Sequence, residues 1–223
     1  MFWQNSKPRR KTDAALLLLV SACLCAAQAG KVETLGLPKD GTIPDGLRNI
    51  LDNAGHRVIL GDGSVACEIW LRKDVPVQTR KDAADVLYPD LAESTLIGVI
   101  SFPSPASDYR GQAIRAGFYT LRYELIPDDG NHLGVAPNRD FLLLIPVSAD
   151  SDPGATFKFD ELVNLSRKAS ETHHPAPLSL VQAASVNTVS RDDEERWIFS
   201  TVLKLASSND LPFALVVKGT APQ

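Results

Sequence analysis

IRAGFYTLRYELIPDDGNHLGVAPNRDFLLLIPVS, residues 114–148, carries the strongest secondary-structure signal in the 223-residue chain. Between 119 and 125 apolar residues alternate with polar ones, the period of two that places one face of a β-strand on a core. Residues 141–145 are apolar throughout, as in a strand that is covered on both faces. The PDDG segment at 127–130 supplies turn residues between them. The stretch therefore predicts two long strands joined by a loop.

Further short strands are predicted on both sides of this stretch. Residues 56–60 and 64–72 flank a GDG turn and predict a hairpin. Residues 95–102 predict another strand, in which Gly98 allows a close approach or a bulge. Towards the C-terminus, residues 178–186, 197–205 and 212–218 read as strands. Asp160 can cap a helix that reaches about residue 169, and shorter helical turns are expected within 45–53 and 81–88.

Strands thus outnumber helices, and the sequence shows no strand–helix alternation of the kind that indicates parallel pairing. The chain is predicted to be mainly β: an antiparallel β-sandwich of about seven to eight strands with one substantial helix and short helical turns. An apolar fraction of 44% and a charged fraction of 22% are typical of globular proteins. We expect residues 30–223 to form a single β-sandwich domain, because the segments flanking the predicted helix are too short for independent cores.

The N-terminus has the pattern of an export signal. A basic region, KPRRK at 7–11, precedes an uncharged apolar run at 14–27, and Ala27 and Ala29 are the small residues that signal peptidase accepts. The apolar run is shorter than the ~20 residues of a membrane-spanning helix. We therefore expect residues 1–29 to be a signal peptide that is cleaved between Ala29 and Gly30, leaving a secreted or periplasmic protein with no membrane span. As an alternative, VSAC at 20–23 resembles a bacterial lipobox, which would make a lipidated Cys23 the N-terminus.

Cleavage at Gly30 would change both the charge and the cysteine count. It would remove four of 23 Lys and Arg residues and one of 27 Asp and Glu residues, leaving 19 basic and 26 acidic residues, a formal net charge of −7. This balance disfavours nucleic acid as a partner, because phosphate backbones require clustered Lys and Arg. Cys67 would be the sole remaining cysteine, which excludes an intramolecular disulfide. Its place on an apolar strand face favours a buried thiol over a reactive one.

Polar residues in two segments are candidates for a functional site. One segment is the loop of the central hairpin, with His132, Arg139 and Asp140, and the other lies around His174, after the predicted helix. If the fold brings His132, His174 and Asp140 together, they could hold a metal or act as acid and base. Arg139 beside Asp140 is more typical of a loop anchor than of a ligand contact. Trp70 interrupts the polar face of its strand, so it either stacks on a ligand or is covered by a neighbouring element.

Recognised catalytic motifs are missing from the sequence. It contains no H-E-x-x-H motif, no C-x-x-C pair and no calcium loop, and it lacks both the G-x-S-x-G elbow and a glycine-rich phosphate loop. We therefore assign no catalytic residue, no metal ligand and no cofactor from the sequence.

Several segments resemble a group of secreted bacterial proteins of unknown function. The matching pieces are VACEIWLRKDVP at 65–76, AGFYTLRY at 116–123, GVAPNRDFLLL at 134–144, HPAPLSL at 174–180 and LPFALVVKG at 211–219. The resemblance covers most of the chain after residue 30 and implies export and a β-rich fold. It implies no particular activity, cofactor or catalytic residue.

These observations favour an exported, non-enzymatic protein that binds an envelope component, a glycan or a protein partner. Ligand contacts would then come from His132, Arg139, Asp140, His174 and Trp70. Two other functions remain open: a small hydrolase or metal-dependent enzyme that uses His132, His174 and Asp140, and a structural envelope protein. The mutual placement of those three side chains discriminates between binding and catalysis.

Overall fold

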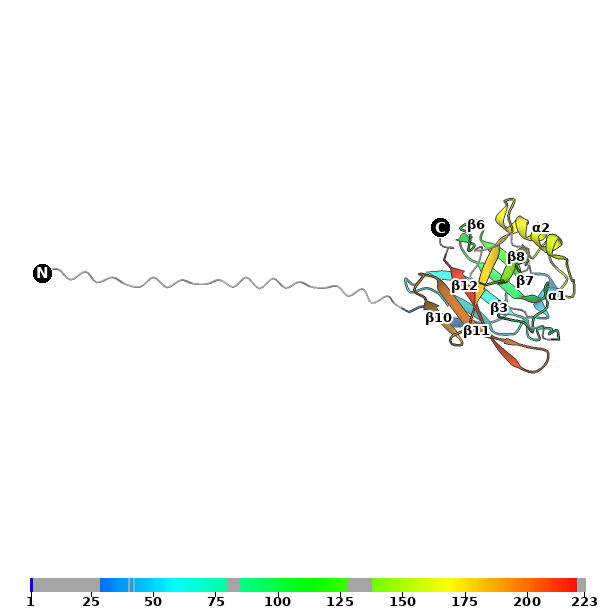
Figure 1. Ribbon diagram of the computed structural model, residues 1–223, viewed down its shortest axis with the longest axis horizontal. Helices are drawn as coiled ribbons and strands as arrows, with labels where there is room; N and C mark the ends of the chain where they lie inside the picture. The colour runs from blue at the N-terminus through cyan, green and yellow to red at the C-terminus, as the bar shows by residue number, and fades with distance from the viewer. Residues whose placement is uncertain (2–28, 40, 42, 80–84, 128–137, 220–223) are drawn as a thin grey trace.

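The computed structural model describes residues 1, 29–39, 41, 43–79, 85–127 and 138–219. Figure 1 shows a body built mainly of strands, with helix α2 (Phe159–Ser170) along one side and the short helix α1 (Asp45–Arg48) at another. The body is therefore β-rich, as the sequence pattern predicts.

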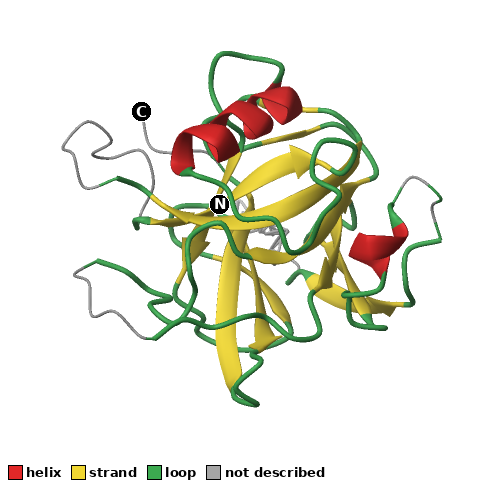
Figure 2. Cartoon of the chain, turned by 90° about the vertical axis from the view of Figure 1, so that its right-hand side faces the viewer, coloured by secondary structure: helices red, strands yellow, loops and turns green. Residues whose placement is uncertain are grey.

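Ten strands form one antiparallel sheet, and Figure 2 shows the strands curving around the body. Their order across the sheet is β1 (Lys31–Leu35), β2 (Gly55–Ile59), β3 (Val65–Leu71), β4 (Leu96–Phe102), β7 (Gly117–Leu125), β8 (Asp140–Pro146), β9 (Pro177–Val181), β12 (Asp210–Lys218), β11 (Trp197–Lys204) and β10 (Thr188–Arg191). The outermost strands, β1 and β10, contact each other, so the sheet is a nearly closed barrel. β5 (Ala106–Ser107) and β6 (Ala113–Ile114) form a separate two-stranded sheet.

The mainly antiparallel β architecture is confirmed, but the predicted sandwich of about seven to eight strands is wrong. The alternation of inward and outward residues is the same in a sandwich and in a barrel, so the pattern does not show whether a sheet closes on itself. Two of the ten strands lie in segments for which the sequence predicts no strand. Residues 31–35 pair with β2, and residues 188–191 pair with β11.

The central hairpin and its neighbours form where the sequence predicts them. β7 and β8 pair antiparallel from Tyr119 opposite Pro146 to Leu125 opposite Asp140. β2 and β3 make the predicted hairpin. The predicted helix is α2, which begins at Phe159, so Asp160 lies in its first turn and is not the cap. The backbone N–H of Lys158, which precedes the helix, instead donates to the carboxylate of Glu161 at 2.9 Å.

Two glycines allow strands to approach closely. A β-carbon at Gly98 would collide with the carbonyl oxygen of Trp70 on β3, and the β4–β7 register shifts between Leu96 and Gly98. The close approach and the bulge that the sequence suggests at Gly98 are therefore both present. At the seam of the barrel, a β-carbon at Gly30 would collide with the side chain of Val189 and lie 2.8 Å from the Ile59 carbonyl oxygen. Glycine at this position thus lets the two edges of the sheet meet.

Apolar side chains fill the barrel, and further apolar clusters cover parts of its outer surface. Inside lie Val58, Cys67, Ile69, Ile100, Leu121, Leu142, Leu144, Leu178, Phe199, Phe213 and Leu215. Outside, Leu47 of α1 packs in a cluster with Trp70 and Val99. Leu162 of α2 packs against the outward-facing Phe141, Leu143 and Ile145 of β8. β8 is thus apolar throughout because both of its faces are covered, as the sequence predicts.

A candidate ligand groove

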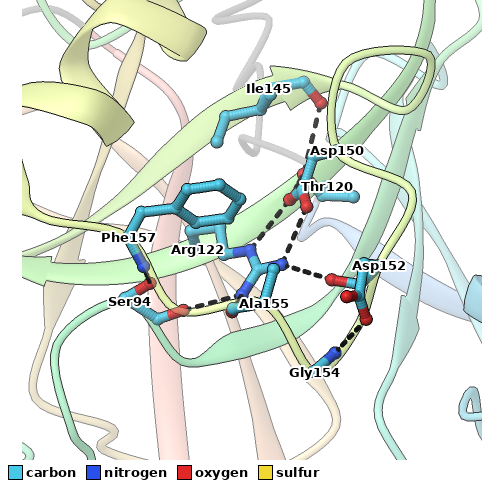
Figure 3. Close-up of polar contacts among 9 residues, drawn as sticks. All are labelled: Ser94, Thr120, Arg122, Ile145, Asp150, Asp152, Gly154, Ala155 and Phe157. Carbon is cyan, nitrogen blue, oxygen red and sulfur yellow. Dashed lines mark hydrogen bonds and ion pairs between the residues drawn. The ribbon is translucent and has the colours of Figure 1, made fainter.

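A buried polar cluster surrounds Arg122 on the outer face of β7 (Figure 3). Arg122 is 1% exposed and forms a bidentate ion pair with the buried Asp150, with its Nε 2.8 Å and its Nη2 2.7 Å from the two carboxylate oxygens. Its remaining donors reach three carbonyl oxygens, those of Ser94 at 2.9 Å, Ala155 at 2.7 Å and Asp152 at 2.9 Å. All five guanidinium donors are therefore used within the protein, and the role of this cluster is structural.

Asp140 lies inside one end of the barrel, where its carboxylate holds a loop in place. It is fully buried and accepts hydrogen bonds from the backbone N–H groups of Leu87 at 2.8 Å and Tyr88 at 3.0 Å. The hydroxyl of Tyr123, on the inner face of β7, also donates to it at 2.7 Å. Burial, and then the adjacent Asp140 carboxylate, raise the pKa of Tyr123 and keep it in the donor form.

Two further residues singled out from the sequence make structural contacts. Arg139 is half-buried, and its Nε donates to the carbonyl oxygen of Ile126 at 3.0 Å. This bond joins the residue that follows β7 to the residue that precedes β8. Trp70 is 3% exposed, and its indole N–H donates to the carbonyl oxygen of Gly36 at 2.8 Å. A ligand could stack on Trp70 only by displacing the segment that covers it.

Cys67 lies inside the barrel and is fully buried. Burial raises the pKa of its thiol, and the nearby Glu68 carboxylate raises it further. The nucleophilic thiolate is therefore strongly disfavoured, in agreement with the buried-thiol interpretation of the sequence.

The structure does not bring His174 and Asp140 together. Phe141, the residue after Asp140, packs on the outer face of β8 beneath α2, whereas Asp140 bonds to Tyr123 on the inner face. Neighbouring residues of a strand point to opposite faces, so Asp140 is separated by the sheet from the surface on which His174 lies. His132 falls outside the described residues, so a His132–His174 contact stays a prediction. The described part of the chain contains no group of three His, Cys, Asp or Glu side chains placed to hold a metal ion.

His174 instead lines an open groove of about 510 Å³ along α2. The helix contributes Phe159, Val163 and Arg167, which lie four residues apart and therefore on one helical face. The eight steps of helical rise from residue 159 to residue 167 make this wall about 12 Å long. The outer face of the sheet contributes the floor, from Phe141, Pro177 and Ser179.

At the end of the groove next to the last turn of α2, two loops hydrogen-bond to each other. Gln112 accepts from the Thr172 hydroxyl at 2.6 Å and donates to the Pro175 carbonyl oxygen at 2.9 Å. The buried Asp108 carboxylate accepts from the Gln112 side chain at 2.6 Å and from the backbone N–H of Arg110 at 2.9 Å. These bonds fix the positions of Arg110 and of the His173–His174 pair at one end of the groove.

Positive charge predominates among the groove residues. Arg110 and Arg167 are exposed, and among the described residues neither guanidinium forms an ion pair with a carboxylate. Two histidines, His173 and His174, lie with them, and Asp160 is the single acidic residue of the lining. The chain as a whole carries more acidic than basic residues. The groove is therefore suited to hold an anionic group next to apolar surface.

A larger cavity, of about 770 Å³, lies between the β2–β3 turn and residues 103–107. Its arginine, Arg57, is already paired, with Nη2 2.8 Å from the Glu68 carboxylate and Nη1 3.8 Å from Glu33. Lys218, which also lines it, is exposed and forms no ion pair among the described residues. This cavity therefore offers a ligand one cation outside an ion pair, against two in the groove along α2, although its volume is larger.

Comparisons with known proteins add no relative: no family model, no curated protein and no solved structure matches this chain. Across the residues that the structure describes, none of the helices combines the length and the apolar character needed to cross a membrane.

The groove includes His174, which sequence reasoning singled out, together with residues that it did not. Arg110 and Arg167 come from a loop and from a helix 57 positions apart, and each looks like an ordinary solvated charge in the sequence. A basic residue in line with Phe159 and Val163 along one helical face was the available signal for Arg167. No comparable periodic signal marks Arg110.

Proposed function

We propose that this chain is an exported, non-enzymatic binding protein whose ligand site is the groove along α2. The observation that carries the proposal is the pair of exposed guanidinium groups, Arg110 and Arg167, beside an apolar floor, neither of which forms an ion pair with a carboxylate of the described residues. The ligand is a component of the envelope, a glycan or a protein of the exported compartment. The volume of the groove, about 510 Å³, is that of a typical small-ligand site.

The use of the other polar side chains supports binding over catalysis. Asp140 and Arg122 have their hydrogen-bonding capacity taken up by the fold, and Cys67 is buried as a thiol. A general acid or base needs to reach a substrate within hydrogen-bonding distance, which the buried Asp140 does not do. The polar groups that remain at the groove are suited to recognising charge.

Export is tested by the mass of the protein recovered from outside the cytoplasm. We expect a chain that begins at Gly30, because Ala27 and Ala29 fit the positions that signal peptidase reads. Intact-mass spectrometry measures this directly. A chain that begins with a diacylated Cys23 would show the lipid-anchored alternative instead, and a chain that retains residues 1–29 in the cytoplasm would contradict export.

A tryptophan at Val163 tests the groove as the binding site. Val163 is half-buried in the middle of the helical wall, so Val163→Trp fills the groove without touching the barrel core. We expect the immobilised variant to lose the component that the unchanged protein captures from an envelope extract. The readout is mass spectrometry of the captured fraction.

Lys168→Trp is the matched control, because Lys168 is exposed on the same helix and lies outside the groove lining. This variant carries the same new side chain and should capture the component normally. Thermal unfolding checks that both variants are folded. Equal capture by the Val163→Trp variant and the unchanged protein would show that the groove is not the binding site.

A further inference from the structure

We propose that the ligand of the groove is a small amphiphilic anion, with one carboxylate or phosphate head group on an apolar body. This inference rests on the proposed function and assigns the chemistry of its ligand. Three observations support it: the unequal distribution of charge along the groove, the dimensions of the groove, and the hydrogen-bonded pairing of the strands that form its floor.

The groove has a basic end and an apolar end. Arg167 lies in the last turn of α2, next to the loops that carry Arg110, His173 and His174. At the other end, α2 begins with Phe159, close to the point where β7 ends and β8 begins. The lining there is apolar and consists of Ile126, Pro127, Phe141 and Phe159, with Asp160 beside them.

This arrangement orients an amphiphile in one direction. The head group is expected to pair with Arg110 and Arg167, because a guanidinium binds carboxylate and phosphate through two parallel hydrogen bonds. The apolar body then lies over Phe141 and beside Phe159 and Val163. The Asp160 carboxylate repels a second negative charge at that end, which favours a ligand with a single head group over an anion that is charged along its length.

The floor of the groove disfavours an extended peptide. Peptides that bind along sheets commonly add a strand to an open edge, where unpaired backbone groups supply the hydrogen bonds. The floor residues of β9 pair with β8 through residues 177–179, and the Pro177 carbonyl oxygen accepts a hydrogen bond from the backbone N–H of Tyr109 at 3.4 Å; β12 pairs with the next two residues, Leu180 and Val181. An amphiphilic anion needs only the cationic side chains and the apolar surface, and both are present.

Four probes used below their micelle concentrations test the ligand chemistry by calorimetric titration of the exported chain. Decanoate and decyl phosphate carry the two possible head groups and show which one the site prefers. Decyltrimethylammonium keeps the tail and reverses the charge, and acetate keeps the carboxylate without the tail. We expect at least one of the two decyl anions to bind, with both control probes weaker by about tenfold or more.

Charge-removing variants connect that binding to the groove. The double variant Arg110→Gln/Arg167→Gln should weaken binding of the preferred decyl anion by about tenfold or more, because it removes both guanidiniums. Lys168→Gln removes one charge from the same helix outside the lining and should leave the affinity within about twofold, since an exposed charge contributes little. Unchanged affinity in the double variant would overturn the proposal, and so would equal binding of decyltrimethylammonium.

The two proposals fail in different ways. If Val163→Trp abolishes capture of the natural component while neither decyl anion binds the unchanged protein, the groove is the binding site and the ligand is of another class. An acidic peptide found in the captured fraction would then be the leading replacement. If a decyl anion binds through Arg110 and Arg167 while Val163→Trp captures the component normally, the ligand chemistry is correct and the biological partner binds elsewhere.

Discussion

Replacing Arg122 with methionine should lower the free energy of unfolding by about 3–5 kcal/mol. The substitution leaves the fully buried Asp150 carboxylate without its counter-charge, in a place where water cannot replace the guanidinium. Three carbonyl oxygens, those of Ser94, Asp152 and Ala155, lose their donors at the same time. Urea denaturation near neutral pH measures the change as a lower midpoint at an unchanged slope.

Two further variants separate the ion pair from the surrounding packing. Arg122→Met combined with Asp150→Leu removes both charges and should recover a large part of the lost stability, because no buried charge is then left unpaired. Arg122→Lys keeps the charge without the planar five-donor group and should remain clearly destabilised. A loss of less than about 1 kcal/mol in the Arg122→Met variant would contradict the structural role of the cluster.

Glu124 should make the protein lose stability as the pH rises from about 5 to 9. Glu124 is 1% exposed, and burial raises the pKa of its carboxyl group to about 8. The backbone N–H of Leu125 donates to this carboxyl group at 3.1 Å and lowers its pKa, whereas the neighbouring Glu93 raises it. A carboxyl whose pKa is higher in the folded state stabilises the fold while it is protonated. That contribution is complete below the ordinary glutamate pKa of about 4.5 and is lost as the pH rises through about 8.

The Glu124→Gln variant should remove this pH dependence, because the amide stays neutral throughout. We expect the variant to equal the unchanged protein near pH 5 and to exceed it in stability by a few kcal/mol near pH 9, at about 1.4 kcal/mol for each unit of pKa shift. Denaturation curves at several pH values measure the difference. Glu93→Gln is the comparison, and it should reduce the pH dependence in part, because burial of Glu124 remains. Parallel stability profiles for the Glu124→Gln variant and the unchanged protein would refute the assignment.

The parts of the fold that local sequence patterns determine could be predicted. The β7–β8 hairpin, the β2–β3 hairpin, the close approach at Gly98 and helix α2 all follow from periodicity and turn chemistry within about 35 residues. Closure of the barrel could not be predicted in this way. It depends on a contact between Gly30 and Val189, and nothing in either local segment indicates the other.

The same distinction between local and distant contacts applies to the polar residues. Arg122 alternates with apolar neighbours as a solvent-facing residue does, yet it is buried because the loop carrying Asp150 folds over it. Asp140 has the sequence context of a loop residue and lies inside the barrel end. In each case the partner that decides the role comes from another element of the fold, so the single-strand pattern gives the right strand and the wrong environment for its polar side chains.

The seam between β1 and β10 sets an order of events during biosynthesis. Synthesis begins at the N-terminus, so β1, which ends at Leu35, exists long before β10, which begins at Thr188. Until that later segment is available, the outer edge of β1 lacks the neighbour that contacts it in the folded barrel, and an open strand edge can pair with another chain. Closing a contact so distant in sequence is slow. The time between the two events is therefore the period in which this protein is most exposed to aggregation.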